Sequence, residues 1–171
     1  MNGKSFFYTY FSSPLGSILL LSNGKELTGL YMDEERYGPK IDARWVENPS
    51  AKPFPITTAQ LQEYFDGERR EFSVPFLVTG TPFQLTVWSA LTGIPYGSTI
   101  SYRDLAASIG CPKSIRAVGG ANARNLISII IPCHRVIGSD GSLTGYGGGL
   151  DREAALLSFE AHVLSIKEQV R

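Results

Sequence analysis

The sequence predicts an α+β fold, with strands over the first half of the chain and helices over the second. Hydrophobic residues make up 43% of the 171 residues and charged residues 19%, which is typical of a globular protein with a sizeable core. Before residue 33 the apolar residues occur in short runs between turn signals, the pattern of strands. After residue 80 they follow capping residues and recur at helical spacing, the pattern of short helices.

The first half of the chain predicts three short strands, a loop, a helix and a last strand. Turns at SPLG and at Asn23-Gly24 separate the first three strands, which lie in FFYTYFSS (6–13), SILLLS (17–22) and KELTGLYM (25–32). The polar stretch 33–55 has no periodicity and predicts a loop. In TTAQLQEYFDG (57–67), Thr57 or Thr58 can cap a helix that Gly67 ends, and a short strand near FSVPFLV (72–78) follows.

The second half predicts four helices, and a start signal precedes each of the first three. TPFQ (81–84) is a capping box with proline at the first helical position, and its helix continues to Gly93. Ser101 caps a second helix, which Gly110 ends, and a third follows over PKSIRAVGGANA (112–123). Two short helices around a tight glycine-containing turn indicate a helix-turn-helix, a motif found in many DNA-binding proteins. The last helix is expected over DREAALLSFEAHVL (151–164).

Charge and cysteine content limit the classes of function. The net charge is zero, but residues 103–135 carry five Lys or Arg side chains and one Asp, which weakly favours an anionic partner. Two cysteines make no disulfide framework, and this indicates a reducing compartment. The N-terminal stretch lacks the features of a signal peptide, and no apolar run has the length of a membrane span. We therefore expect a cytoplasmic protein with no membrane partner.

The stretch IIIPCHRVIG (129–138) places a thiol where it can react. Most free cysteines are small buried hydrophobes without chemistry, because reactivity needs a special environment. Here Pro132 breaks the apolar run before Cys133, and the basic side chains of His134 and Arg135 follow; nearby positive charge lowers the pKa of a thiol. The flanking stretches are rich in Gly, Asn and Ser, a composition that allows a ligand to approach the backbone closely.

Other chemistries for this thiol have weaker support. Cys111, Cys133, His134 and His162 lack the paired spacing of a zinc site, so no metal is expected. A redox pair would need Cys-x-x-Cys, and the sequence cues of cysteine proteases are missing. A nucleophilic thiol beside a histidine, downstream of a helix-turn-helix, favours covalent chemistry on nucleic acid. A non-enzymatic DNA-binding module and a cysteine hydrolase or transferase for small molecules are the alternatives.

Three motifs resemble those of one protein family. IPCHRVIG (131–138), RAVGGAN (116–122) and TGYGGG (144–149) are similar to motifs of the O6-alkylguanine–DNA alkyltransferases, also called methylated-DNA–protein-cysteine methyltransferases. The resemblance implies a supporting α/β domain with a small antiparallel sheet over residues 1–80. A mainly helical catalytic and DNA-binding domain would follow over 81–171. It further implies a monomer that moves an alkyl group from O6-alkylguanine in double-stranded DNA irreversibly to its own cysteine, once per molecule and without a cofactor.

The resemblance implies a catalytic role for each of five residues. Cys133 would be the nucleophile, His134 its base through a bridging water, and Glu160 the residue that orients the histidine. Asn125 would brace the turn that holds the thiol. Tyr102 would donate a hydrogen bond to the guanine and stabilise the charge that develops on it as it leaves.

The resemblance also implies how the duplex is bound. The second helix of the helix-turn-helix would enter the minor groove, and the target nucleotide would rotate out of the base stack. Arg116 would fill the space that the base leaves. Arg103 and Ser139 are expected to contact phosphates, and Tyr102 the flipped base.

The alkylguanine pocket is implied by the same resemblance. Backbone carbonyls of Cys133 and Val136 would accept from the exocyclic amine, while Tyr146 and Gly147 would line the pocket, with the Gly147 amide facing O6. Gly147 stands where some relatives have serine, so the resemblance does not define the alkyl group accepted. Related alkyltransferase-like proteins lack the cysteine and only bind lesions, so a lesion-binding sensor or regulator without transfer activity is the alternative function.

Overall fold

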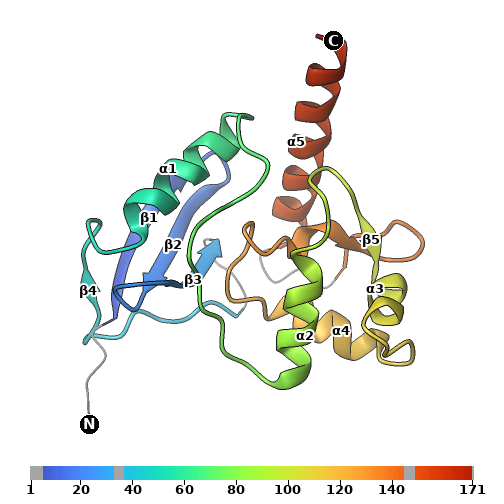
Figure 1. Ribbon diagram of the computed structural model, residues 1–171, viewed down its shortest axis with the longest axis horizontal. Coiled ribbons are helices and arrows are strands. Elements are labelled where there is room, and N and C mark those ends of the chain that lie inside the picture. The colour runs from blue at the N-terminus through green and yellow to red at the C-terminus, as the bar shows by residue number, and fades with distance from the viewer. Residues whose placement is uncertain (1–5, 33–36, 145–148, 171) are drawn as a thin grey trace.

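The computed structural model of the chain describes residues 6–32, 37–144 and 149–170. Within these ranges it confirms the predicted α+β class: a sheet with one helix lies on one side of the molecule and the remaining helices lie on the other (Figure 1). The buried hydrophobic residues of both sides form one continuous core. Among the described residues, no helix combines the length and the apolar character that crossing a bilayer requires.

Over the described residues the sheet has four strands, in the order β3-β2-β1-β4. Their bounds are β1 Phe7–Ser13, β2 Gly16–Ser22, β3 Leu27–Met32 and β4 Val46–Glu47. The first three strands pair antiparallel, as the turn signals predict, and the side chains of Ile18 and Leu20 point from β2 into the core. The two-residue β4 pairs parallel to β1 within a stretch for which the sequence predicts only a loop.

Helix α1, Phe54–Phe65, lies across the sheet, and its predicted start is wrong (Figure 1). It begins three residues before Thr57, directly after Pro53, because the first turn of a helix tolerates residues without a free N–H. Thr57 and Thr58 do not cap it. Their hydroxyls donate to the carbonyl oxygens of Pro53 and Phe54 at 2.8 and 3.0 Å.

The strand predicted over 72–78 reduces to a single bridge. Phe76 pairs with Leu27 of β3, through Leu27 N–H to Pro75 O and Leu77 N–H to Leu27 O, both 2.9 Å. Pro75 has no N–H to donate, so the pairing does not extend into a ladder.

The outer edge of β3 also pairs with the second half of the chain. Leu30 N–H donates to Leu126 O at 2.9 Å and Ser128 N–H donates to Leu30 O at 3.0 Å, a parallel bridge centred on Ile127. Leu30 and Ile127 are fully buried. The segment that leads to the thiol is therefore anchored to the sheet of the first half.

The second half contains the four predicted helices: α2 Pro82–Leu91, α3 Tyr102–Ser108, α4 Ile115–Ala123 and α5 Leu150–Gln169. The capping box is confirmed, since Thr81 Oγ1 accepts from Gln84 N–H and Gln84 Oε1 from Thr81 N–H. The predicted cap of α3 is confirmed too, because Ser101 Oγ accepts from Asp104 N–H. Helix α4 begins three residues after Pro112, and α5 extends beyond the predicted range at both ends.

A small parallel pairing brings the thiol turn beside the helix-turn-helix. Strand β5, Ile100–Ser101, pairs with β6, Val136–Ile137. Because α3 starts directly after β5, and the 3-10 turn Cys133–Arg135 ends directly before β6, Tyr102 and Cys133 are held near one another. Helices α3 and α4 pack together as the predicted helix-turn-helix.

Candidate active site

The segment before the thiol is buried and braced from within. Asn125 donates from Nδ2 to the carbonyl oxygens of Ile127 and Ile131 at 3.3 and 2.8 Å, and its Oδ1 accepts from Ile127 N–H at 3.1 Å. Between them Ile129 has a φ of 71°, a conformation unusual for a β-branched residue. The amide of Asn125 thus adds to the backbone hydrogen bonds of this irregular turn, in which Ile127 O also accepts from Ile131 N–H at 3.0 Å.

The thiol itself is almost inaccessible: Cys133 is 2% exposed. It follows Pro132 and starts the 3-10 turn, with its N–H donating to Ile131 O at 2.8 Å. Its carbonyl oxygen accepts from the backbone N–H of Val136 and from Nδ2 of Asn122 at 3.2 Å. Neither Cys133 nor Cys111 is in a disulfide.

The carboxylate of Glu160 is the polar centre of the site. It lies fully buried on α5 and accepts from His134 Nε2 and Tyr64 Oη, both at 2.8 Å, and from Gly97 N–H at 3.0 Å. Arg135 binds both of its oxygens, from Nη2 at 2.8 Å and from Nε at 3.0 Å. Burial alone would raise the pKa of Glu160, but the hydrogen bonds from His134 and Arg135 outweigh it and lower the pKa to about 2. Glu160 is therefore ionised at neutral pH.

His134 is held neutral with a defined tautomer. The ring is fully buried, and burial lowers its pKa below 6.5 even though the hydrogen bond to Glu160 acts in the opposite direction. An ionised carboxylate can only accept, so Nε2 carries the proton in the network with Glu160. The lone pair is then on Nδ1, which is buried and has no hydrogen-bond partner among the described residues. One basic nitrogen is available one residue from the thiol.

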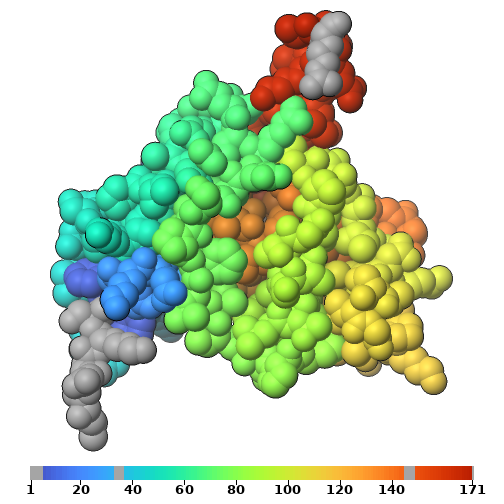
Figure 2. Space-filling view, in the orientation of Figure 1, coloured from blue at the N-terminus to red at the C-terminus, as the bar shows by residue number. Residues whose placement is uncertain are grey.

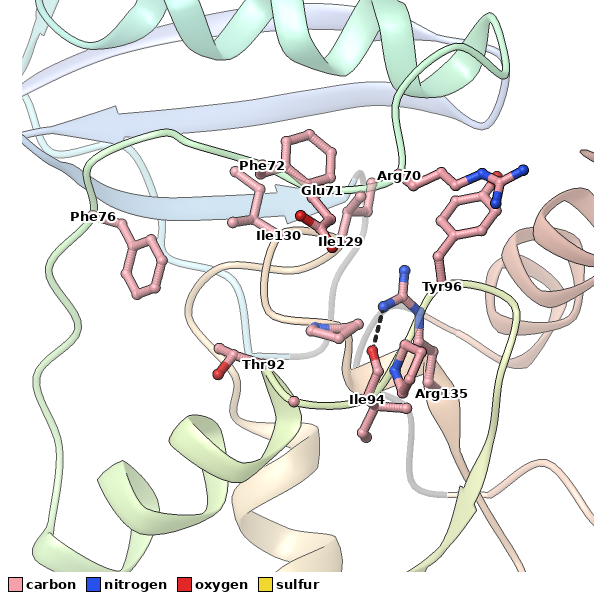
Figure 3. A pocket seen from close by; sticks show the side chains of 13 residues that line it. Arg70, Glu71, Phe72, Phe76, Thr92, Ile94, Tyr96, Ile129, Ile130 and Arg135 are labelled. Carbon is pink, nitrogen blue, oxygen red and sulfur yellow. Dashed lines mark hydrogen bonds between the residues drawn. The ribbon is translucent and has the colours of Figure 1, made fainter. Parts of the chain in front are cut away.

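Arg135 completes the ion pair and lines a separate cavity. Its Nη1 donates to Ile94 O at 2.7 Å, and its guanidinium lies 5.5 Å from the centre of the Tyr96 ring (Figure 3). The cavity, of about 470 Å³, lies between the two halves and appears as a hollow in Figure 2. Pro132 and Arg135 line it, but Cys133 and His134 do not. This cavity therefore lies beside the thiol turn and is distinct from the surroundings of the thiol.

Tyr102 begins α3 with its side chain buried beside the thiol turn. Its hydroxyl donates to Thr144 O at 2.5 Å and accepts from Asn122 Nδ2 at 3.4 Å. Burial raises the pKa of Tyr102 to about 12, and the negative charge of Glu153 adds to the effect. At neutral pH the phenol is a hydrogen-bond donor.

Glu153 is a second buried carboxyl group near the site, two helical turns before Glu160 on the same face of α5. It is fully buried in the first turns of α5, and neither of its oxygens has a hydrogen-bond partner within the described ranges. Burial raises its pKa to about 7. An unpaired buried carboxyl group is unusual and costs stability when it ionises.

The residues expected to contact DNA are exposed, and part of the expected pocket is not described. Arg116 on α4, Arg103 on α3 and Ser139 after β6 are solvent-exposed, whereas Val136 is buried beside Cys133. Tyr146 and Gly147 lie outside the described residues. No group of three or more possible metal ligands occurs among the described residues.

Several residues of the site are missed by reasoning from the sequence. Asn122 lies within the motif RAVGGAN, which is a signal of position but not of role. Arg135 is expected from the sequence only as a positive charge near the thiol, and the structure pairs its guanidinium with Glu160. Glu153 lies seven residues before Glu160, two helical turns along the same buried face, and this spacing could have indicated it. No sequence signal connects Tyr64 to a residue 96 positions away.

Comparisons with known proteins agree over both halves of the chain. Two family models match: the ribonuclease-like domain of 6-O-methylguanine DNA methyltransferase over residues 6–78, and the DNA binding domain of the same family over 82–162. The methylated-DNA–protein-cysteine methyltransferase of Mycobacterium bovis is 49% identical over 153 residues, 90% of this chain and 91% of that protein. The constitutive enzyme of Bacillus subtilis is 44% identical over 168 residues, 95% of this chain and 99% of that protein.

A solved structure agrees as well. The crystal structure of Mycobacterium tuberculosis OGT in complex with DNA has a TM-score of 0.85 and 46% sequence identity, and the match covers 92% of this chain and 94% of that one.

Replacing Glu160 by Gln should strongly destabilise the protein. The change leaves the guanidinium of Arg135 buried without a counter-ion, so we expect the free energy of unfolding at pH 7 to fall by about 3–5 kcal/mol. Because the pKa of Glu160 is lowered from 4.5 to about 2, the ionised carboxylate contributes to the free energy of unfolding above pH 4.5. This contribution is lost as the pH falls towards 2. Urea unfolding across this range measures it. Glu63→Gln, which breaks a partly exposed pair with Arg69, is the control, with an expected loss below about 1 kcal/mol; equal losses would contradict the prediction.

Replacing Glu153 by Gln should stabilise the protein in a pH-dependent way. The folded state binds the proton of Glu153 more tightly than the unfolded state, because the pKa rises from 4.5 to about 7. The wild-type free energy of unfolding therefore falls as the pH rises from 4.5 to about 7, and the neutral variant escapes this loss. We expect Glu153→Gln to be more stable by a value on the order of 3 kcal/mol at about pH 8, and nearly equal at about pH 4.5. A difference that is the same in urea unfolding at both pH values would refute the assignment.

Proposed function

The chain belongs to the O6-methylguanine-DNA methyltransferase family, and on that premise we propose that Cys133 is the residue that accepts the alkyl group. The function of the protein is DNA repair by alkyl transfer, and DNA is its partner. One observation carries the proposal for Cys133: the residue after it is a neutral histidine whose Nε2 is bound to an ionised carboxylate and whose Nδ1 is unpartnered among the described residues.

The transfer begins with activation of the thiol. Nδ1 of His134 takes the thiol proton through a bridging water, and Glu160 stabilises the imidazolium that forms. The sulfur–carbon bond then forms as the bond between the alkyl carbon and guanine O6 breaks, and its electron pair stays on the guanine. The product thioether is not hydrolysed, so each molecule reacts once. A depressed histidine pKa suits this role, because the ring is a neutral base at physiological pH.

The substrate must be O6-alkylguanine that has left the base stack. A thiol that is 2% exposed cannot reach an atom inside a duplex, so the nucleotide has to rotate into the protein. Helix α4 docks in the minor groove, and the exposed Arg116 occupies the space vacated by the base. Arg103 and Ser139, also exposed, contact the phosphates.

Tyr102 and the backbone around the thiol hold the flipped base. The Tyr102 hydroxyl turns from Thr144 O to the guanine and stabilises its developing negative charge. The carbonyl of Val136 accepts from the exocyclic amine. The carbonyl of Cys133, which already has two donors, does so only by sharing or exchanging one of them. Tyr146 and Gly147 form walls of the proposed alkylguanine pocket.

Three properties of the whole protein complete the proposal. Residues 1–80 support residues 81–171, which carry every residue proposed to react with the lesion or contact the DNA. The protein acts as a monomer, since one chain supplies the complete set. It works in the cytoplasm, where a reducing environment keeps its nucleophile as a thiol.

The test of this function is transfer to a single cysteine. After mixing with a duplex that contains one O6-methylguanine, intact-protein mass spectrometry with peptide mapping should find one methyl group on Cys133 and no more. Cys133→Ala should take none and still bind the lesion, while the matched control Cys111→Ala should react like the wild type. Methylation of the Cys133→Ala variant would exclude Cys133 as the acceptor. An unmodified wild type that binds the lesion tightly would favour the sensor function.

Replacing Arg116 by Ala should impair reaction with duplex DNA but not with a free O6-alkylguanine base. The free base needs no rotation out of a stack, whereas flipping costs a few kcal/mol that Arg116 partly offsets. We expect the rate on duplex to fall about 10- to 100-fold and the rate on free base to stay the same. The exposed Arg44 of the first half provides a control, and its replacement by Ala should change neither rate. Equal losses on both substrates would rule out the proposed role of Arg116.

A further inference from the structure

One buried amide connects the proposed nucleophile with the proposed hydrogen-bond donor. Asn122 lies on α4 and is 1% exposed. Its Nδ2 is 3.2 Å from the carbonyl oxygen of Cys133 and 3.4 Å from the hydroxyl oxygen of Tyr102. An amide nitrogen has two N–H groups, so it can donate to both oxygens at once. Asn122 therefore joins the DNA-docking helix to the two residues that act on the guanine.

The other end of the same amide is left without a partner. Asn122 Oδ1 is buried and accepts no hydrogen bond from any part of the chain that the structure describes. A buried amide oxygen without a donor costs about 1–3 kcal/mol, so an apolar residue would serve a purely structural role at lower cost. This cost indicates that the N–H groups have a use beyond packing.

The contact with Tyr102 changes the acidity of the phenol. Burial, the charge of Glu153 on α5 and the proximity of Cys133 in the 3-10 turn all raise the pKa of Tyr102, whereas the hydrogen bond from Asn122 lowers it. A phenol whose oxygen accepts a hydrogen bond is a stronger donor through its own O–H, because the two bonds polarise one another. Among the described groups that shift the pKa of Tyr102, the hydrogen bond from Asn122 is the one that favours donation by the phenol.

We propose that Asn122 is a positioning residue that acts through Tyr102 and Cys133. One N–H stabilises the negative charge that builds on the Tyr102 oxygen as the phenol donates its hydrogen bond to the departing guanine. The other N–H donates to the carbonyl oxygen of Cys133, and this hydrogen bond fixes the position of the thiol turn relative to Tyr102. The inference rests on the roles proposed above for Cys133 and Tyr102.

The test is the single-turnover rate of alkyl transfer to Cys133, on duplex and on free O6-alkylguanine base. Asn122→Ala should slow both by about 10-fold or more, because the amide acts on the chemical step and not on flipping. Its affinity for lesion-containing duplex should be unchanged. In a Tyr102→Phe background the same substitution should have a much smaller effect, because the Tyr102 oxygen is gone and only the contact with the Cys133 carbonyl remains.

The variant Asn122→Asp keeps the shape of the side chain and adds a pH signature that a packing role would not produce. Above the pKa of the new carboxyl group, its charge faces the Cys133 carbonyl and draws the Tyr102 hydroxyl away from the guanine. Glu153 brings further negative charge to this region. Between about pH 6 and pH 9 we expect the ratio of variant to wild-type rate to fall as the pH rises. Asn48→Asp, whose Oδ1 accepts from Ser50 N–H in an exposed turn, should follow the wild type throughout.

Three outcomes would overturn the role of Asn122 while leaving the function intact: an unchanged rate for Asn122→Ala, additive losses with Tyr102→Phe, or a wild-type pH profile for Asn122→Asp. Failure of the wild-type protein to acquire a methyl group on Cys133 would instead refute the proposed function. Melting temperatures of the variants identify any that fail to fold, and the nearly isosteric Asn122→Asp then carries the test.

Discussion

The buried carboxylate of Glu160 is the constraint on which the site depends. A charge removed from water must be surrounded by donors, and the fold supplies them from four places: α1, the loop before β5, His134 and Arg135. Tyr64 on α1 connects the first half of the chain to the site through its hydrogen bond to Glu160. These donors come from three elements, because His134 and Arg135 share the 3-10 turn, and the carboxylate aligns the three with one another.

This arrangement determines the chemistry available to the thiol. Glu160 holds the proton of His134 on Nε2, so the lone pair on Nδ1 is the one that can accept a proton. Burial keeps the imidazole neutral and excludes bulk water, which suits a reaction in which the acceptor is used once and has no need of turnover. With Cys133 as the proposed acceptor, the same burial requires the alkylated base to enter the protein.

The molecule concentrates its unfavourable polar burial near this site. Within the described ranges, the buried polar atoms without a hydrogen-bond partner belong to His134, Asn122 and Glu153, which lie around Tyr102 and Cys133, and to Tyr96, which lines the adjacent cavity. Elsewhere in the described core, buried polar groups such as Thr57 and Asn125 have hydrogen-bond partners. Unsatisfied groups that cluster at one place, against an otherwise satisfied interior, are expected where a site has been shaped for a ligand at the expense of stability.

The sequence by itself determined the elements whose signals are local. The capping box at Thr81 and the cap at Ser101 act within one helical turn. The run IPCHRVIG places the thiol of Cys133 next to the imidazole of His134 because the two residues are neighbours in the chain. Only the tertiary structure decided that Tyr64 and Glu160 meet, that the amide of Asn122 bridges Tyr102 and Cys133, and that 72–78 makes one bridge to β3. These contacts join residues far apart in the chain, and residue periodicity records which face of an element is buried but not which partner buries it.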